Sequence, residues 1–418
     1  MLATGDRGRF GLPCKVRATA AVLVTLAMTG CGTHGGTVPT SPSASIQPIR
    51  AATPRTSTAG RTSQSTVHRQ HATPPPTWIR MVGGRIGWGL SAGHILRTSD
   101  GGATWVDVTP ANMVAAQGGE NAAFLGQEVA FIEMATRQGD TSPSTELEKT
   151  SNGGASWTSV HIPASAPDGL QMSFPSLGHG WALAHVGVGA GHDSVVLLST
   201  SDGGTMWHRI LATSPTGQAG LPDAGVKVGM TFQTSSRGWI SGYSNVGGAY
   251  LYMTRDGGTS WTAQTLSLPS QLSSVSGGGN LVVLPPSTFG STNAVLPVCA
   301  GSAGHGVLVD FYATHDGGMR WGGTHVLSLS GPSLCVGLQW SFADPSHGWV
   351  SDGKSLYTTT DGGTLWSRSP LPGDNISAIQ EVDFVSPTAG WILATSTSQR
   401  LGLFQTKDAG HTWSTLPG

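Results

Sequence analysis

The chain has 418 residues, with 61 Gly, 14 Trp and only 11% charged residues, and no apolar run approaches the roughly 18 residues of a membrane-spanning helix. This composition excludes a multi-pass membrane protein, a coiled coil and a charge-driven disordered chain, and it favours many short strands joined by tight turns. The net charge of −1 conceals an asymmetry: residues 1–76 carry +7 and residues 77–418 carry −8, which argues against a nucleic-acid partner for the acidic part.

Residues 1–31 have the features of an export signal. A basic start precedes an apolar stretch at residues 18–28, and the cations of that start are Arg7, Arg9, Lys15 and Arg17. The stretch is too short to span a membrane but suits a signal peptide. It leads to Met28-Thr29-Gly30-Cys31, which resembles the bacterial lipobox, with Met28 where Leu is usual. The resemblance implies that Cys31 is lipidated, giving a membrane-anchored, extracytoplasmic lipoprotein at the cell surface or in the periplasm. Without lipobox processing the protein would be secreted.

Residues 32–76 are predicted to form a disordered linker. They contain 9 Thr, 6 Ser and 7 Pro among 45 positions and no acidic residue, so they cannot bury enough apolar surface to offset the entropy lost on ordering. As a flexible coil the segment would reach roughly 40 Å, which is enough to hold a folded domain away from a membrane.

Residues 77–418 contain seven copies of one motif, Thr-x-Asp-Gly-Gly-x-x-Trp, called the repeat motif below. The Thr, the second Gly and the Trp occur in every copy, whereas Asn152 replaces the Asp once and Ala409 replaces the first Gly once. Successive copies lie 45 to 60 residues apart, a period typical of propeller blades. The expected structural residues are Asp100, Asn152, Asp202, Asp256, Asp316, Asp361 and Asp408, with Trp105, Trp157, Trp207, Trp261, Trp321, Trp366 and Trp413.

The repeat motif has the chemistry of a tight turn. An Asp or Asn side chain can accept backbone N–H groups one to three residues ahead, and the Gly residues adopt positive φ without a steric penalty. The chain then returns as a strand whose Trp buries a large ring. Five repeats also contain an upstream Gly-Trp pair, and these pairs begin at Gly87, Gly180, Gly238, Gly348 and Gly390. In the second and fifth repeats the corresponding segments are residues 129–131 and 294–296.

Each repeat therefore predicts four short antiparallel strands in about 49 residues, which is one propeller blade. The expected fold is all-β, a seven-bladed β-propeller of four-stranded antiparallel blades over residues 77–418. The first strand should start near Trp78 and the last should end near Leu416. Each blade would then come from contiguous sequence, and blade 1 would close on blade 7 through side-chain packing.

The repeat motif resembles the Asp-box, or BNR, repeat of sialidases, Vps10-type receptors and some xyloglucanases. Together with the Gly-Trp pairs, it is most similar to the photosystem II stability/assembly factor family, a seven-bladed propeller, over about residues 77–418. This resemblance implies a platform without catalysis that binds a protein client or a membrane-protein complex. Photosynthetic members of that family present a basic patch, whereas residues 77–418 carry −8, which disfavours a photosystem client.

The alternative is a secreted glycoside hydrolase of the sialidase or xyloglucanase kind, or a lectin that binds a cell-surface glycan. Sialidases carry an Arg-Ile-Pro signature, and this chain has none. A two-carboxylate hydrolase needs an Asp or Glu on each side of the scissile bond. The candidates are Glu381 and Asp383 on an expected innermost strand, and Glu120 near the start of another. Solvent-facing positions on strands explain these three residues equally well.

Cysteine and histidine residues complete the prediction. Cys14 lies in the export signal and Cys31 at the lipobox, which leaves Cys299 and Cys335; in an oxidising compartment these two are expected to form a disulfide, with two buried free thiols as the alternative. No zinc-type Cys/His spacing, phosphate loop or dinucleotide motif occurs, so we expect no metal and no cofactor. The expected form is a monomeric binding platform.

Overall fold

The computed structural model describes residues 75–417, except 112, 116–120, 135–144, 190, 214–219, 245–247, 276–279, 303–305, 324, 331–334, 336, 337 and 374. The expected export signal with Cys31, nearly all of the expected linker, and Glu120 lie outside the described residues. No helix in the described part of the chain combines the length and the hydrophobicity of a membrane span.

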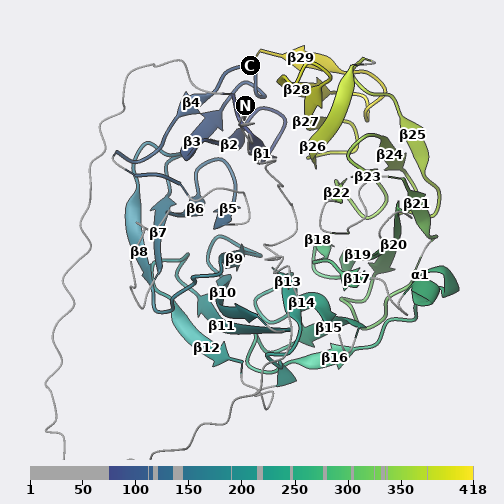
Figure 1. The fold of residues 1–418 in the computed structure, drawn as a ribbon. Helices are drawn as coiled ribbons and strands as arrows, with labels where there is room; N and C mark the ends of the chain where they lie inside the picture. The colour runs from purple at the N-terminus through teal and green to yellow at the C-terminus, as the bar shows by residue number, and fades with distance from the viewer. Residues whose placement is uncertain are drawn as a thin grey trace, which may run out of the picture.

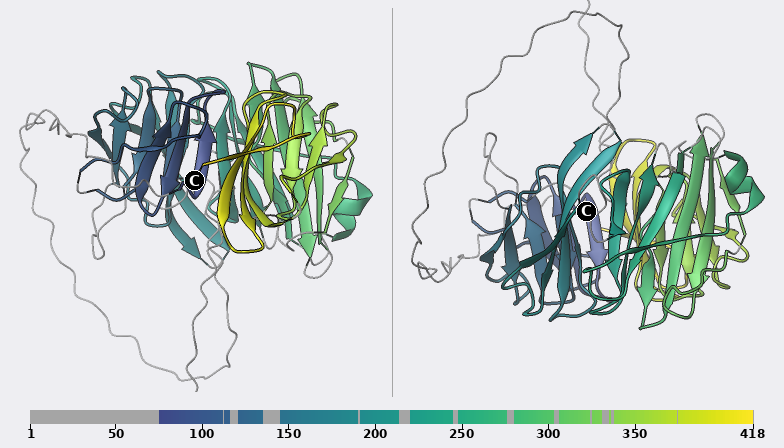
Figure 2. Two further views of the ribbon diagram at one scale, coloured as in Figure 1. Left: turned by 90° about the horizontal axis from the view of Figure 1, so that it is seen from above. Right: turned by 90° about the horizontal axis from the view of Figure 1, so that it is seen from below.

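Seven β-sheets stand in a ring around a central axis, and Figure 2 shows their strands running between the two faces of the ring (Figures 1 and 2). Residues of all seven blades line hollows near this axis, and this central region is called the channel below. Within each sheet the strands are antiparallel and follow chain order from the channel to the rim (Figure 1). Blade 1 is β1 (Trp78–Met81), β2 (Gly87–Ser91), β3 (His94–Thr98) and β4 (Val106–Asp107). Blade 2 is β5 (Ala122–Phe124), β6 (Ala130–Glu133), β7 (Thr145–Thr150) and β8 (Thr158–Ile162). Blade 3 is β9 (Leu170–Ser173), β10 (Gly180–Gly189), β11 (His192–Thr200) and β12 (His208–Ala212).

The same plan continues around the ring. Blade 4 is β13 (Val226–Phe232), β14 (Gly238–Ser244), β15 (Gly248–Thr254) and β16 (Thr262–Gln264). Blade 5 is β17 (Asn280–Val283), β18 (Ser287–Phe289), β19 (Asn293–Ser302), β20 (Gly306–Thr314) and β21 (Leu327–Leu329). Blade 6 is β22 (Gln339–Phe342), β23 (Gly348–Ser351), β24 (Leu356–Thr359) and β25 (Ser367–Ser369). Blade 7 is β26 (Ile376–Phe384), β27 (Gly390–Ser396), β28 (Leu401–Thr406) and β29 (Ser414–Leu416).

The seven-bladed all-β prediction is confirmed, and blade 5 is the one departure from four strands. Its innermost strand is divided into β17 and β18, which both pair with β19. Pro285 and Pro286 lie between these two pieces and have no N–H to donate to the ladder. A short helix, α1 (Ser270–Val275), precedes the blade. Every blade comes from contiguous sequence, as expected, with no strand borrowed across the closure.

All seven copies of the repeat motif form the same hydrogen-bonded turn. The Thr hydroxyl donates to the Asp or Asn Oδ1 at 2.8–3.0 Å and accepts the N–H of the second Gly at 2.8–2.9 Å. The same Oδ1 accepts the N–H four residues ahead in every copy, one residue beyond the reach that the sequence predicted. The Thr therefore connects both sides of the turn, which explains why it never varies.

Neighbouring blades are joined by stacked aromatic rings. Between blades 6 and 7, Trp349 lies flat on Phe384, with 3.6 Å between ring centroids and 4° between planes, and Trp413 meets Phe384 edge-on. The Trp349 indole N–H donates to the carbonyl of Ala409, in the repeat motif of the next blade, at 3.0 Å. Blades 3 and 4 are joined in the same way by Trp181, Phe232, Trp261 and Gly257.

The ring closes by the same contacts, without a shared strand. The Trp391 indole N–H of blade 7 donates to the Gly101 carbonyl of blade 1 at 2.8 Å. Trp391 is fully buried in a cluster with Ile79 and Met81, and Met81 takes the place that Phe has in five other blades. Closure through side-chain packing, as the sequence predicts, is therefore confirmed.

Candidate binding site at the channel mouth

The innermost strands end together at one end of the channel, which we call the mouth. Their terminal positions in six blades are Met81, Phe124, Phe174 (directly after β9), Phe232, Phe342 and Phe384. The ring of Phe384 fills the space that a side chain at Gly390 would need, and Phe342 does the same at Gly348. The terminal rings are thus packed between blades, and the residues just before them line the channel, including Arg80, Ser341 and Asp383.

Two hollows lie side by side at the mouth. The larger of the two has a volume of about 530 Å³ and is lined by Arg80, Met81, Val82, Thr231, Pro285, Pro286, Ser287, Thr288, Phe289, Trp340, Ser341, Phe342, Asp383, Phe384 and Val385. The smaller has a volume of about 410 Å³ and is lined by Arg80, Met81, Val82, Phe124, Leu125, Gly126, Phe174, Pro175, Ser176 and Leu177. Arg80 and the two residues after it are shared, so Arg80 stands between the hollows.

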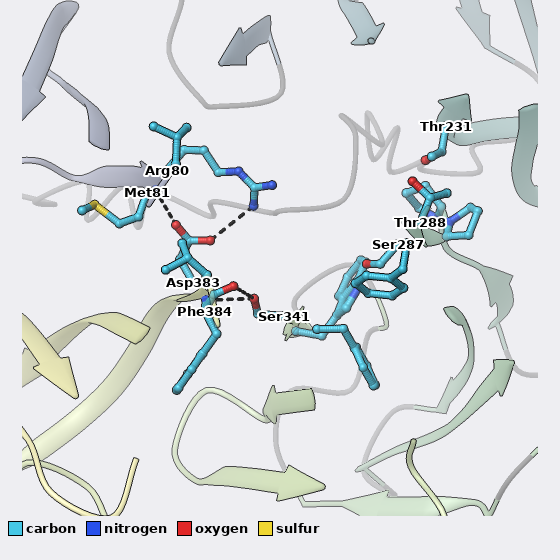
Figure 3. Close-up of a pocket in the computed structure, with 15 residues that line it drawn as sticks. Arg80, Met81, Thr231, Ser287, Thr288, Ser341, Asp383 and Phe384 are labelled. Carbon is cyan, nitrogen blue, oxygen red and sulfur yellow. Dashed lines mark hydrogen bonds and ion pairs between the residues drawn. The ribbon is translucent and has the colours of Figure 1, made fainter. Parts of the chain in front are cut away.

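Arg80 and Asp383 form an ion pair across the closure of the ring (Figure 3). Arg80 Nη1 lies 3.2 Å from Asp383 Oδ1, and the Met81 backbone N–H donates to Asp383 Oδ2. The Asp383 side chain is 1% exposed, whereas that of Arg80 is 49% exposed. Both carboxylate oxygens of Asp383 are therefore engaged by blade 1, and the guanidinium keeps one face toward the hollows.

At two other blade junctions, a Ser stands at the position that Asp383 has in blade 7. The Phe232 N–H of blade 4 donates to Ser173 Oγ of blade 3 at 2.8 Å. The Phe384 N–H of blade 7 donates to Ser341 Oγ of blade 6 at 2.9 Å. A hydroxyl is thus sufficient to accept the terminal N–H of the next inner strand. Asp383 supplies that acceptor and also a second oxygen, which holds Arg80.

The catalytic candidates do not form an acid–base pair around a hollow. Asp383 lines one, but both of its oxygens are engaged in closing the ring. Glu381 is 4% exposed and is not part of the lining of either hollow. The sequence alternative that these two carboxylates face solvent is wrong, since both are buried. Glu120 lies outside the described residues.

A second buried polar cluster joins blades 3 and 4 near the start of β13. Lys227 is 1% exposed, and its ammonium donates to the carbonyls of Asp193 and Asp223, both at 2.8 Å. Burial lowers the Lys227 pKa to about 8. His185 Nδ1 lies 2.8 Å from Asp193 Oδ1. Because the ammonium is used by backbone carbonyls and is covered, this cluster is a connection between blades and not a site for a ligand.

Two further positions concern the sequence predictions. A disulfide joins Cys299 on β19 to Cys335 near the start of blade 6, and both residues are buried. Within the described ranges no three His, Cys, Asp or Glu residues gather in a way that could hold a metal ion.

The sequence does not identify Arg80 as a site residue, because a single Arg on a short strand is expected to face solvent. The only available signal was its place next to the residue that ends an innermost strand.

No protein-family model matches this sequence, and no curated protein does either. Similarity is found among solved structures. YCF48 bound to D1 peptide is 18% identical, over 82% of this chain and 99% of that chain, with a TM-score of 0.50. A prolyl endopeptidase is 9% identical, over 82% of this chain and 50% of that chain, also at 0.50. The GH74 xyloglucanase of Xanthomonas campestris is 14% identical, over 79% and 62% of the two chains, at 0.33. At such identities the likeness concerns the fold alone.

Proposed function

We propose that this protein is an extracytoplasmic, membrane-anchored propeller that binds a protein client at the channel mouth, as part of complex assembly, without catalysing a reaction. The observation that carries the proposal is the use of Asp383. The carboxylate that lines the larger mouth hollow is buried and holds Arg80 and the Met81 N–H, so it closes the ring instead of serving as an acid or base.

The form of the mouth supports binding of a polypeptide. Two adjoining hollows offer a continuous surface with both polar and apolar groups, and a propeller presents such a surface on a rigid frame. YCF48, which has a similar fold, has been solved with a D1 peptide bound. A ring of this architecture can therefore hold a peptide, and we propose the same class of partner here.

The anchoring part of the proposal comes from the sequence. Lipidation of Cys31 would place the propeller at a membrane surface, and the linker would let it reach a membrane-protein complex roughly 40 Å away. Replacing Cys31 with Ala should release the protein from the membrane fraction. Retention of the variant in that fraction would contradict anchoring through this residue.

A pull-down from solubilised membranes, combined with a panel of glycan substrates, tests the function. The full-length protein should recover a membrane-protein client and release no sugar. Sugar release that disappears in Glu381→Gln, but persists in the matched exposed variant Glu146→Gln, would show a glycosidase and overturn the proposal.

A further inference from the structure

Arg80 is a cation that the fold holds in place at the junction of the two mouth hollows. Apart from Arg80, the charged residues of the innermost strands are Lys227, Glu381 and Asp383, and all three are buried. A guanidinium has five N–H donors, and the hydrogen bond to Asp383 comes from Nη1. Figure 3 shows the guanidinium extended from β1 over the larger hollow, on the side facing Ser287 and Thr231.

The ion pair with Asp383 makes this cation ready to bind. Holding a long side chain in its bound rotamer before the ligand arrives reduces the entropy that binding would otherwise cost. A Ser at position 383 would have served the strand junction, as Ser173 and Ser341 do. The carboxylate thus adds the orientation of Arg80 to a structural role that needs only a hydroxyl. The planar fork of Arg suits a carboxylate, which it can engage with two parallel hydrogen bonds.

The walls of the two hollows beside Arg80 determine which groups can lie next to a ligand that binds Arg80. The smaller hollow has apolar side chains in its wall beside polar groups, and these side chains are Phe124, Leu125, Phe174, Pro175 and Leu177. The Leu177 side chain is an exposed large apolar residue, with 61% of it accessible. On the other side of Arg80, Pro285, Pro286 and Phe289 line the larger hollow together with hydroxyl groups. Apolar side chains of a client can pack against these apolar parts of the walls, next to groups that can form hydrogen bonds.

From these contacts we infer that Arg80 binds the carboxylate of an Asp or Glu side chain in the client, and that apolar residues on each side of that acid occupy the two hollows. The inference rests on the proposed client-binding function and names the segment that is recognised. A highly charged polyanion does not fit, because residues 77–418 carry −8 and would repel it. A short segment with one acidic residue meets Arg80 without that repulsion.

The test is a selection of short random peptides, with both ends chemically blocked, on four immobilised forms of the full-length protein. These are the wild type, Arg80→Met, the double variant Arg80→Met/Asp383→Ser, and Arg85→Met. The double variant leaves no unpaired carboxylate and copies the Ser found at two other junctions, so it should fold even where Arg80→Met alone does not. Arg85→Met is the matched control, since it removes the same charge from an exposed position that lines neither hollow. Thermal melting checks that each form is folded.

The wild type and Arg85→Met should enrich peptides with one Asp or Glu between apolar residues. For a selected peptide, changing the acid to its amide should weaken binding about tenfold or more on the wild type and hardly at all on the double variant. Acid-containing peptides selected equally by the double variant would overturn the inference. Selection of peptides without an acid would overturn it too, but would leave the proposed client binding intact. No peptide selected, or a uronate oligosaccharide bound in its place, would overturn both.

Discussion

The junction between blades 6 and 7 and the body of blade 5 use different residues to fill the space between neighbouring blades. At the regular junction Trp349 stacks on Phe384 and donates to the repeat motif of the next blade. In blade 5 the strand pairing places Val295 where five blades have that Trp, and Thr288 where five blades have the terminal Phe. Phe311, from the third strand of blade 5, contacts Phe342 and Trp366 of blade 6 in place of a Trp from the second strand.

This difference shows which part of the ring can supply residues to a binding site. The repeat motif and the Gly-Trp pair use most of the large side chains to pack the blades together. Blade 5 keeps the repeat motif but lacks the Gly-Trp pair, and there Pro285, Pro286, Ser287, Thr288 and Phe289 line the larger mouth hollow. The disulfide between Cys299 and Cys335 lies in the same core cluster and adds a covalent link to the next blade. The site is therefore found where the Gly-Trp pair is missing and the packing is supplied by other means.

The largest expected effect comes from the stacked ring at the regular junction. Trp349→Ala should lower the free energy of unfolding by about 3–5 kcal/mol, because it removes a buried indole and its cross-blade hydrogen bond. Val295→Ala, at the same place in blade 5, should cost only about 1.5 kcal/mol. Urea unfolding followed by Trp fluorescence measures both. Equal losses would break the comparison between the two kinds of blade.

Removing the disulfide should weaken blade 5 almost as much. The double variant Cys299→Ala/Cys335→Ala should lose about 3–4 kcal/mol, the chain-entropy value for a loop whose ends are 36 residues apart. Peptide mapping of the unfolded, unreduced protein should find neither cysteine with a free thiol. Two reactive thiols at these positions would show that the packing of blade 5 does not depend on a covalent link.

Glu133 offers a pH test in blade 2, which also lacks the Gly-Trp pair. It takes the register position of Leu393 in blade 7, and burial raises its pKa to about 7. Because the folded state binds this proton more tightly than the unfolded state, stability should fall as the pH rises from about 4.5 to 7. Glu133→Gln should remove that part of the slope and raise stability at pH 8 by about 2–3 kcal/mol. Denaturant melts at several pH values measure it, and an unchanged slope would refute the assignment.

A smaller effect is expected at the Gly of the Gly-Trp pair. Gly390→Ala should cost about 1–3 kcal/mol, since the added methyl group would overlap the ring of Phe384. In blade 5 the same register position is already Ala294, opposite Thr288, so Ala294→Gly should cost only about 0.5–1 kcal/mol. Thermal melting of the two variants compares them. A Gly390→Ala variant as stable as the wild type would mean that the ring of Phe384 does not restrict this position to Gly.

The smallest effect concerns the one repeat motif without its first Gly. Ala409 has a φ of 64°, whereas the glycines of the motifs have φ between 69° and 97°. Ala409→Gly should therefore stabilise the protein by about 0.5–1 kcal/mol, and Gly101→Ala in blade 1 should destabilise it by a similar amount. Differential scanning calorimetry of the pair gives the sign, and a shift in the same direction for both would contradict the account.

Local rules predicted the ring but not its site. The repeat motif predicts the number of blades, because an acceptor, two glycines and a Trp at fixed spacing specify one turn and one buried ring each time. The strand limits near Trp78 and Leu416 follow from the same period, and the structure has them at these residues. The division of the inner strand of blade 5 follows from Pro285 and Pro286, which interrupt the strand that the repeat pattern predicts there.

The site depends on contacts between residues far apart in the chain. Arg80 and Asp383 are 303 residues apart and meet only because the ring closes. Their spacing therefore carries no local signal. The sequence makes Asp383 a catalytic candidate only because it is a carboxylate. Its hydrogen bond from the Met81 N–H gives it a structural role, and no sequence pattern reveals that contact. Similarly, Glu133 ends the strand Ala130–Glu133 after three apolar residues, and only the packing of the folded ring shows that its carboxyl group is buried.

The most direct test of client binding at the mouth is site-specific photo-crosslinking in the intact, membrane-associated protein. A photoreactive amino acid replaces Thr288, which lines the larger hollow, or Thr415, which is exposed on the outermost strand of blade 7. The account predicts that the probe at Thr288 crosslinks to one protein, identified by mass spectrometry. It also predicts that this product is lost in Arg80→Met/Asp383→Ser and absent with the probe at Thr415. Crosslinking of the same protein from both positions, or from Thr415 alone, would contradict binding at the mouth.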